Sequence, residues 1–215
     1  MPQIQSLRGI AILSVFLFHL DLLFKSGFFH QAFKYGHWGV QLFFLISGYI
    51  MCYKINSYAS WHHFCLKRFL RIAPAVWICL AIYLTLFGIL KMLNTSFYTA
   101  KFWDLVLAIF FVNPFIVNGI FDTTTNYPFQ ILWTLSVELT YYILLGLVHF
   151  TFRRSAQFST TIIFTISLFS ECISQYFAES ILSKLSNALG FQYLPYFVLG
   201  SCFFLMGRSD GGVNS

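Results

Sequence analysis

Long apolar runs separated by short polar segments make up most of this chain of 215 residues. Six of the runs are close in length to the roughly 20 residues that a helix needs to cross a membrane. They cover residues 5–24, 38–53, 74–90, 131–152, 158–177 and 191–206. The pattern predicts an all-α, polytopic bundle of six or seven transmembrane helices, with residues 1–207 as one membrane domain and residues 208–215 as a polar tail.

A further apolar run, residues 102–117, is short and is interrupted by Asn113-Pro114. If it crossed the membrane completely, Arg153 and Arg154 would lie outside, although basic residues usually gather on the cytoplasmic side. A re-entrant segment would keep them in the cytoplasm, and such backbone is tolerated where protein buries it. We therefore favour a re-entrant or surface segment here, with a complete crossing as the alternative.

The basic residues also predict the orientation. Residues 54–71 hold the densest group of Lys, Arg and His side chains, which places this segment in the cytoplasm. Two predicted helices precede it, so the N-terminus is expected to be cytoplasmic as well. The first run resembles a signal peptide in outline, but no small-residue cleavage site follows it and His19 and Asp21 interrupt it. We expect it to remain as the first helix.

The composition agrees with an integral membrane protein and narrows its partners. Of all residues, 58% are hydrophobic and 9% are charged, whereas an average soluble domain is about 25% charged. The net charge of +6 comes from basic residues in short loops rather than in a long stripe, so membrane lipids and not nucleic acid are the expected partners. The five cysteines are scattered without a CxxC pair and most fall in apolar runs, which favours cysteines that act as small hydrophobic residues over a metal site or disulfides.

Arg8 and His19 lie within the first apolar run. Eleven residues are close to three helical turns, so the two side chains share one helix face, about 16 Å apart along the axis. Ionisable groups at such depth usually mark a functional path. A neutral imidazole can accept a proton from a hydroxyl near neutral pH, so His19 is a candidate general base. The alternative is a histidine that only hydrogen-bonds a neighbouring helix.

Arg68 and Arg71 follow Lys67 just before the predicted third helix, which we expect to begin at Pro74. Residues three apart are neighbours on a helix, and two guanidinium groups can hold phosphates with paired hydrogen bonds. This pattern predicts a cytoplasmic site for a phosphorylated donor. The alternative is an ordinary basic anchor at the membrane boundary.

Glu138 is an acid well inside an apolar run, at the end of Trp133-Thr-Leu-Ser-Val-Glu138. A carboxylate in hydrocarbon needs a partner or a proton, which an Arg or His on another helix would supply. The pair could be structural, functional or both. The run from Gly39 to Gly48 contains two glycines and a serine, which favours close helix packing.

Together these motifs resemble the membrane-bound acyltransferase-3 family, which O-acylates exopolysaccharides, lipopolysaccharide O-antigen and related glycans. Five blocks occur in the family's order along nearly all of the chain. They are Ile4-Gln-Ser-Leu-Arg-Gly-Ile-Ala11 with His19, Gly39 to Gly48, Lys67-Arg-Phe-Leu-Arg-Ile-Ala-Pro74, Trp133 to Glu138, and Tyr196-Phe-Val-Leu-Gly200.

The resemblance implies an acetyl or other acyl transfer from acyl-CoA to a hydroxyl of a glycan or lipid-linked saccharide, in a bacterial inner membrane and without a resident cofactor. The implied catalytic residues are His19 as base and Glu138. Arg8, Arg68 and Arg71 would serve the donor, and Trp133 would support the acceptor. Direct attack and an acyl relay through Ser47 or Ser136 both remain open.

The chain departs from the family pattern in two ways. Gln41 stands where the family usually has Asp, Thr134 where it has Ser, and Leu139 where a second acid is frequent. Family members also have about ten helices, so the chain looks C-terminally truncated. Two other functions remain as alternatives: a small proton-coupled transporter that uses the same buried polar groups, and an inactive fragment.

Overall fold

The structure is a computed structural model that describes residues 2–24, 33–92, 106, 109, 132–153, 155–177 and 180–210. Within these ranges it contains α-helices and short 3-10 helices and no strand, which confirms the predicted all-α class. The α-helices are α1 (Pro2–Phe24), α3 (Trp38–Lys54), α4 (Trp61–Met92), α7 (Leu132–Phe152), α8 (Ala156–Tyr176), α9 (Ile181–Leu189) and α10 (Leu194–Asp210). The 3-10 helices are η1 (Ile55–Ser57) and η2 (Phe191–Tyr193).

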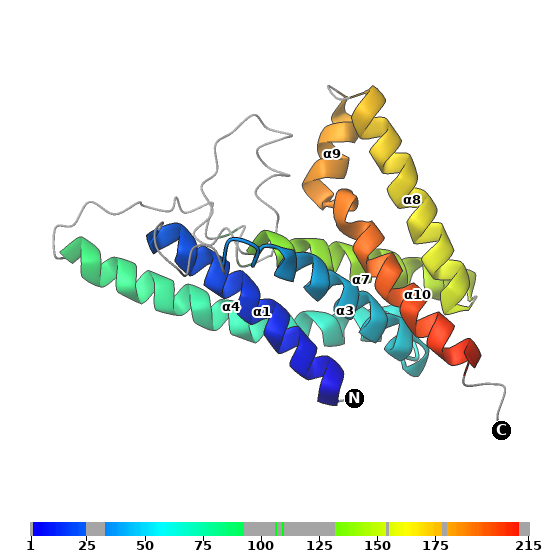
Figure 1. Ribbon diagram of the computed structural model, residues 1–215, viewed down its shortest axis with the longest axis horizontal. Helices are drawn as coiled ribbons and strands as arrows, with labels where there is room; N and C mark the ends of the chain where they lie inside the picture. The colour runs from blue at the N-terminus through cyan, green and yellow to red at the C-terminus, as the bar shows by residue number, and fades with distance from the viewer. Residues whose placement is uncertain are drawn as a thin grey trace.

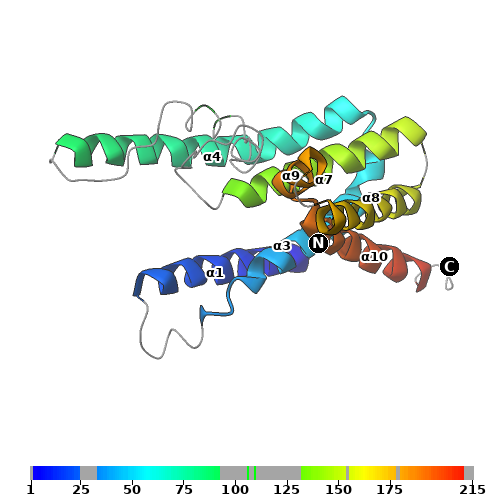
Figure 2. The same ribbon diagram turned by 90° about the horizontal axis from the view of Figure 1, so that it is seen from above.

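The helices form two groups that meet in an aromatic core. α3 packs along α10 and α1, and α4 packs along α7, while α8 contacts both α7 and α10 (Figures 1 and 2). At the centre, the Phe197 ring of α10 stacks on Phe44 of α3 and on Tyr141 of α7, with ring centroids 4.7 and 4.3 Å apart. These large buried rings hold α3, α7 and α10 in a fixed relation, and the candidate site lies beside them.

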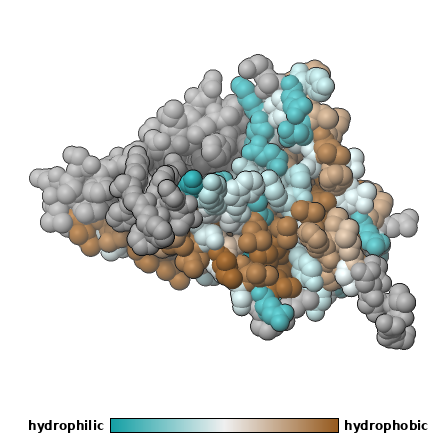
Figure 3. Space-filling view, in the orientation of Figure 1, coloured by the Kyte–Doolittle hydropathy of each residue, from teal (hydrophilic) through white to brown (hydrophobic). Residues whose placement is uncertain are grey.

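The helices have the lengths and surfaces of a multi-pass membrane protein. Four described helices are long and apolar enough to cross a membrane, and a fifth span results if the bent pair of α9 and α10 counts as one. Exposed apolar side chains form a band along the lower part of the face seen in Figure 3. The predicted apolar runs correspond to α1, α3, α4, α7, α8 and α10, whereas the short helix α9 was not anticipated.

The prediction that the third helix begins at Pro74 is wrong, because α4 begins at Trp61 and holds Pro74 in its interior. The N-terminus of α4 is capped by Ser60, whose Oγ accepts a hydrogen bond from the His63 backbone N–H at 3.3 Å. Phe64 and Arg68, four residues apart, are both buried and continue the packed face of the helix toward its start. The charged residues in this stretch hid the helix from the hydropathy pattern.

α4 and α7 run in opposite directions. The side chains of Trp61 and Phe64 near the start of α4 lie against Gly146 in the second half of α7, whereas Leu80 packs near Leu135 at the beginning of α7. α4 therefore ends on the side of the bundle where α7 begins (Figure 1). The expected re-entrant segment, residues 102–117, lies outside the described residues except for positions 106 and 109.

Glycines allow α3 and α10 to approach backbone to backbone. A Cβ atom on Gly48 would overlap the carbonyl oxygen of Phe197, and a Cβ atom on Gly200 would overlap that of Leu45. Ser201 strengthens the contact because its Oγ donates to the Gly48 carbonyl oxygen at 3.2 Å. The packing role predicted for the glycine-containing segment of α3 is thus confirmed.

We expect Gly200→Val to lower the free energy of unfolding by about 1–3 kcal/mol, because the added atoms have no space between the two backbones. Gly207→Val is the matched control, because Gly207 lies on the same helix as Gly200 and a Cβ atom there meets nothing within 4 Å. Thermal unfolding in detergent measures both variants. Equal melting temperatures for the two variants would show that α3 and α10 are not in close contact.

Candidate active site

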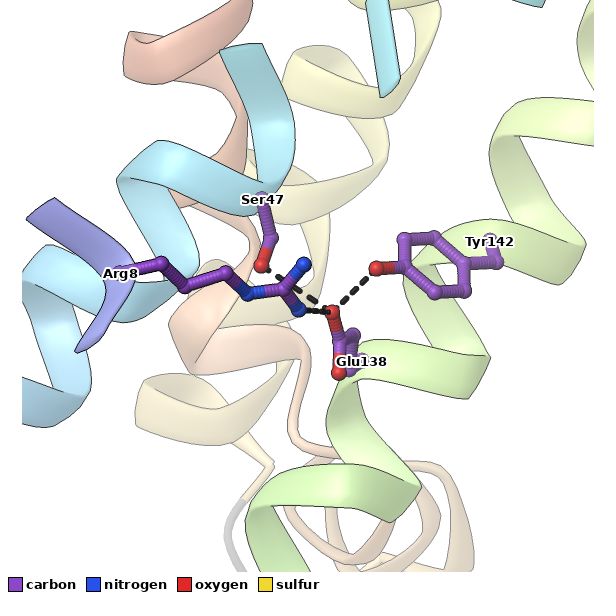
Figure 4. A network of polar contacts seen from close by, with 4 residues as sticks. All are labelled: Arg8, Ser47, Glu138 and Tyr142. Atoms are coloured by element: carbon purple, nitrogen blue, oxygen red, sulfur yellow. Dashed lines mark hydrogen bonds and ion pairs between the residues drawn. The ribbon is translucent and has the colours of Figure 1, made fainter. Parts of the chain in front are cut away.

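A buried ion pair joins the first helix to α7. Arg8 is 9% exposed and Glu138 is 1% exposed, and Nη2 of Arg8 lies 2.5 Å from Oε1 of Glu138. The same carboxylate oxygen accepts hydrogen bonds from Ser47 Oγ of α3, at 3.1 Å, and from the hydroxyl of Tyr142 of α7 (Figure 4). Three helices therefore converge on one oxygen atom, which supplies the partner that a carboxylate in hydrocarbon requires.

The guanidinium group of Arg8 retains an unused hydrogen-bond donor. Its Cζ lies 4.4 Å from the centroid of the Phe43 ring, so the cation also rests on an aromatic face. Nη1 is buried and has no hydrogen-bond partner among the described residues. A buried donor without an acceptor is costly, so this nitrogen is suited to a ligand oxygen or a water molecule.

A cavity of about 550 Å³ opens between α1, α3, α7 and η2. It contains two of the predicted site residues, His19 from α1 and Trp133 from α7. Two further polar side chains, Gln41 and Thr134, occupy positions where the chain departs from the family pattern. The remaining lining residues are Ile12, Val15, Phe16, Phe18, His37, Val40, Phe43, Leu135 and Tyr193. This mixture of aromatic and polar walls is typical of a small-ligand site.

The cavity and the buried ion pair are adjacent. Phe43 lines the cavity and carries the Arg8 guanidinium on its ring, and Thr134 precedes Glu138 by one helical turn. Along α1, His19 lies about 16 Å from Arg8. Among the described residues, Glu138 contacts Arg8, Ser47 and Tyr142 but has no hydrogen bond with His19. The ionic partner of Glu138 is thus the arginine of the first helix.

Arg68 and Arg71 lie in different environments. Arg68 is 5% exposed, donates a hydrogen bond to the Tyr58 hydroxyl, and faces the rings of Tyr58 and Phe64 at 5.3 and 5.9 Å. Arg71 is exposed on the surface of α4. Arg68 also lies within electrostatic range of Arg8 and Glu138. One arginine of the predicted phosphate site is therefore accessible, and the other extends the buried polar network.

Tyr142 and Tyr58 were missed by the sequence analysis. Tyr142 lies four residues after Glu138, so helical spacing could have placed the two side chains on one face. Tyr58 lies in the short connection before α4 and carries no comparable signal.

The described residues contain no group of three or more His, Cys, Asp or Glu side chains that could hold a metal ion. The five cysteines are all free thiols. The polar groups that the structure describes at the site are His19, the buried Arg8–Glu138 pair and the hydroxyl groups around this pair.

The sequence of this helical bundle matches one known class of proteins. A family model described as an acyltransferase domain matches residues 1–210, and the chain belongs to this acyltransferase-3 family. The resemblance drawn from the five sequence blocks is thus confirmed.

Two relatives illustrate the match. Over 156 residues, the chain is 31% identical to Nodulation protein 10 of Rhizobium leguminosarum bv. viciae. This alignment covers 65% of this chain and 40% of that protein. Over 159 residues, the chain is 26% identical to the peptidoglycan O-acetyltransferase OatA of Listeria monocytogenes. This alignment covers 66% of this chain and 23% of that protein. The matched part of the chain therefore spans less than half the length of either relative. No solved structure matches the chain significantly.

Proposed function

We propose that this protein is a membrane O-acyltransferase that moves an acetyl group from acetyl-CoA to a hydroxyl group of a cell-surface glycan. The observation that carries the proposal is the cavity that His19 and Trp133 both line, beside the buried Arg8–Glu138 pair. Membership of the acyltransferase-3 family supports acyl transfer, and similarity to the Listeria peptidoglycan O-acetyltransferase supports a glycan acceptor.

In the proposed reaction, His19 accepts the proton of the acceptor hydroxyl as the oxygen attacks the thioester carbonyl carbon. A new C–O ester bond forms and the C–S bond breaks. The proton then passes from His19 to the departing CoA thiolate, which leaves the histidine neutral for the next cycle. Trp133 offers an aromatic wall for a sugar ring, and Gln41 offers a neutral amide that can both donate to and accept from hydroxyl groups.

We assign the direct route rather than an acyl relay. Ser47 is fully buried, and its Oγ already donates a hydrogen bond to Oε1 of Glu138, at 3.1 Å. Neither Ser47 nor Ser136 is among the residues that line the His19 cavity. A relay serine would need a neighbouring base and access to the thioester.

The proposal is tested by release of free CoA. The purified protein is incubated in detergent with acetyl-CoA, with and without an oligosaccharide acceptor, and the free thiol is measured. We expect thiol release that increases with the acceptor and matches the amount of ester formed. A transporter or an inactive fragment would release no thiol above the rate without protein.

We propose that the donor approaches the exposed side chain of Arg71 from the cytoplasm. Arg71→Gln should weaken acetyl-CoA binding about 10- to 150-fold, since a charge-assisted phosphate contact is lost. Arg71→Lys should restore part of the affinity, because a point charge cannot reproduce the planar guanidinium. Lys184→Gln removes another exposed cation, on α9, and should leave binding unchanged. Unchanged binding by Arg71→Gln would reduce this residue to a membrane anchor.

We further propose an inner-membrane location with the N-terminus in the cytoplasm. The antiparallel arrangement of α4 and α7 supports a shared side for Arg71 and Arg153, because the start of α4 at Trp61 lies beside Arg153 at the end of α7. In a Cys-less background, cysteines at positions 71 and 153 should both resist a membrane-impermeant reagent added outside, and one at position 124 should react. External labelling at position 153 would contradict the proposed orientation.

A further inference from the structure

A second cavity, of about 680 Å³, lies where the start of α4 meets the end of α7. It is lined by Asn56, Ala59, Ser60, Trp61, His149, Phe150 and Arg153. None of these residues lines the His19 cavity. Figure 2 shows the two helix ends side by side, far along the bundle from the first turn of α7.

Two nitrogen atoms of this cavity's residues are buried without a hydrogen-bond partner among the described residues. They are Nε1 of Trp61 and Nδ1 of His149. The indole nitrogen can only donate, and an imidazole nitrogen can donate or accept according to its protonation. Unpaired buried polar atoms are rare in native proteins, so two of them on residues that line one cavity mark this part of the bundle as short of hydrogen-bond partners.

Arg153 occupies a backbone conformation that does not suit its side chain. Its φ of 48° lies in the left-handed region. Among the described residues, Arg153 is the one non-glycine residue with a positive φ. Helices commonly end with glycine or asparagine in this conformation. An arginine here carries a conformational cost, and strained residues of this kind cluster at functional sites. A role for the guanidinium group in the cavity would explain why an arginine occupies this strained position.

The surroundings of the cavity attract anions. The sequence contains no Asp or Glu between residues 22 and 103 or between residues 139 and 170, which are the regions that supply the lining residues. The long helix α4 begins at Trp61, so the positive end of its dipole lies at this cavity. Arg153 adds a planar guanidinium that matches the oxygen geometry of a phosphate.

The cavity also lies at the ends of two candidate membrane spans. One candidate membrane span begins at Trp61 and another ends at Phe152, so both boundaries fall beside the residues that line the cavity. The rings of Trp61 and Phe150 give it an apolar wall, and Arg153 and His149 give it a polar one. Tryptophan is enriched at membrane–water interfaces, where one side of a site is apolar and the other is wet.

We propose that this cavity binds a phosphate ester, with Arg153 as its main ligand, and that the ester is the headgroup phosphate of an anionic phospholipid. The site is separate from the proposed acyl-transfer cavity and does not depend on that function. A soluble phosphate, including those of CoA, has the same chemistry, and the experiment distinguishes the two sources.

The test measures binding of short-chain phosphatidylglycerol to the detergent-purified protein by native mass spectrometry. Arg153→Gly removes the guanidinium and also relieves the left-handed strain, so the variant should be at least as stable as the parent protein. Its affinity for the lipid should nevertheless fall about 10- to 150-fold, whereas Arg153→Lys should retain part of it. Lys184→Gln, an exposed cation on α9, is the matched control and should bind normally.

Further arms use inorganic phosphate, CoA and short-chain diacylglycerol, which lacks the phosphate. Binding of the lipid but not of diacylglycerol, with loss in Arg153→Gly, supports the proposal and its lipid source. Binding of phosphate or CoA alone, with the same sensitivity to Arg153, supports the phosphate site but overturns the lipid source. Equal binding of every probe by Arg153→Gly and the parent protein, or binding of none, would overturn the site itself.

Discussion

Glu138→Ala should lower the free energy of unfolding by about 3–5 kcal/mol, because it leaves the Arg8 guanidinium buried without its ionic partner. Arg8 and Glu138 are 9% and 1% exposed, and their atoms meet at 2.5 Å, so solvent cannot replace the lost carboxylate without rearrangement. The Ser47 and Tyr142 hydroxyl groups lose their shared acceptor in the same step. Unfolding of the purified protein in detergent, followed by circular dichroism, measures the loss.

A double variant separates the buried charge from the packing around it. Arg8→Met with Glu138→Leu removes both charges and keeps the volumes similar, so it should recover much of the stability lost in Glu138→Ala. Glu171→Gln changes an exposed acid on α8 and should be neutral. If the double variant were no more stable than Glu138→Ala, the cost would lie in packing and not in an unpaired charge.

His19→Ala should abolish acetyl transfer while leaving expression in the membrane near the parent level. Removing a general base costs about 10²–10⁴ in rate, and His19 is a half-buried residue in the wall of a cavity, so its loss should cost little stability. The measurement is the initial rate of acetyl-CoA-dependent ester formation on an oligosaccharide acceptor, with the amount of protein determined by blotting.

His62→Ala is the matched control, because His62 is an exposed histidine on α4 that does not line the His19 cavity. It should retain full activity. More than a few per cent of the parent rate in His19→Ala would remove this residue from the mechanism. A variant with low expression would be compared at equal protein concentration.

The ion pair illustrates what sequence could predict about the site. Glu138 and Arg8 are both ionisable residues within apolar runs, and the cost of burying a charge in hydrocarbon predicts that they find partners. The choice of Arg8 over His19 needed the structure, because it depends on how α1 lies against α3 and α7. Ser47 and Tyr142 converge on the same oxygen through that packing.

The basic segment before Pro74 shows where sequence reasoning failed. A hydropathy scale counts Lys67, Arg68 and Arg71 alike as strongly polar. In the structure Arg68 is buried and donates a hydrogen bond to Tyr58, whereas Arg71 is exposed. The buried stripe of α4 advances in multiples of four residues, through Phe64, Arg68, Val76 and Leu80, and Arg71 lies off this stripe. The apolar length of the other helices was predictable because the membrane thickness sets it.

The most direct test of the central claim supplies labelled acetyl-CoA to inside-out membrane vesicles and counts the label in the glycan. The donor then has access only to the cytoplasmic face, and the label is counted in the glycan recovered from the vesicles. The proposed function predicts label in the glycan with the parent protein, and background label with His19→Ala and with vesicles that lack the protein. Absence of label with the parent protein, or equal label with His19→Ala, would contradict the assignment of acyl transfer to the His19 cavity.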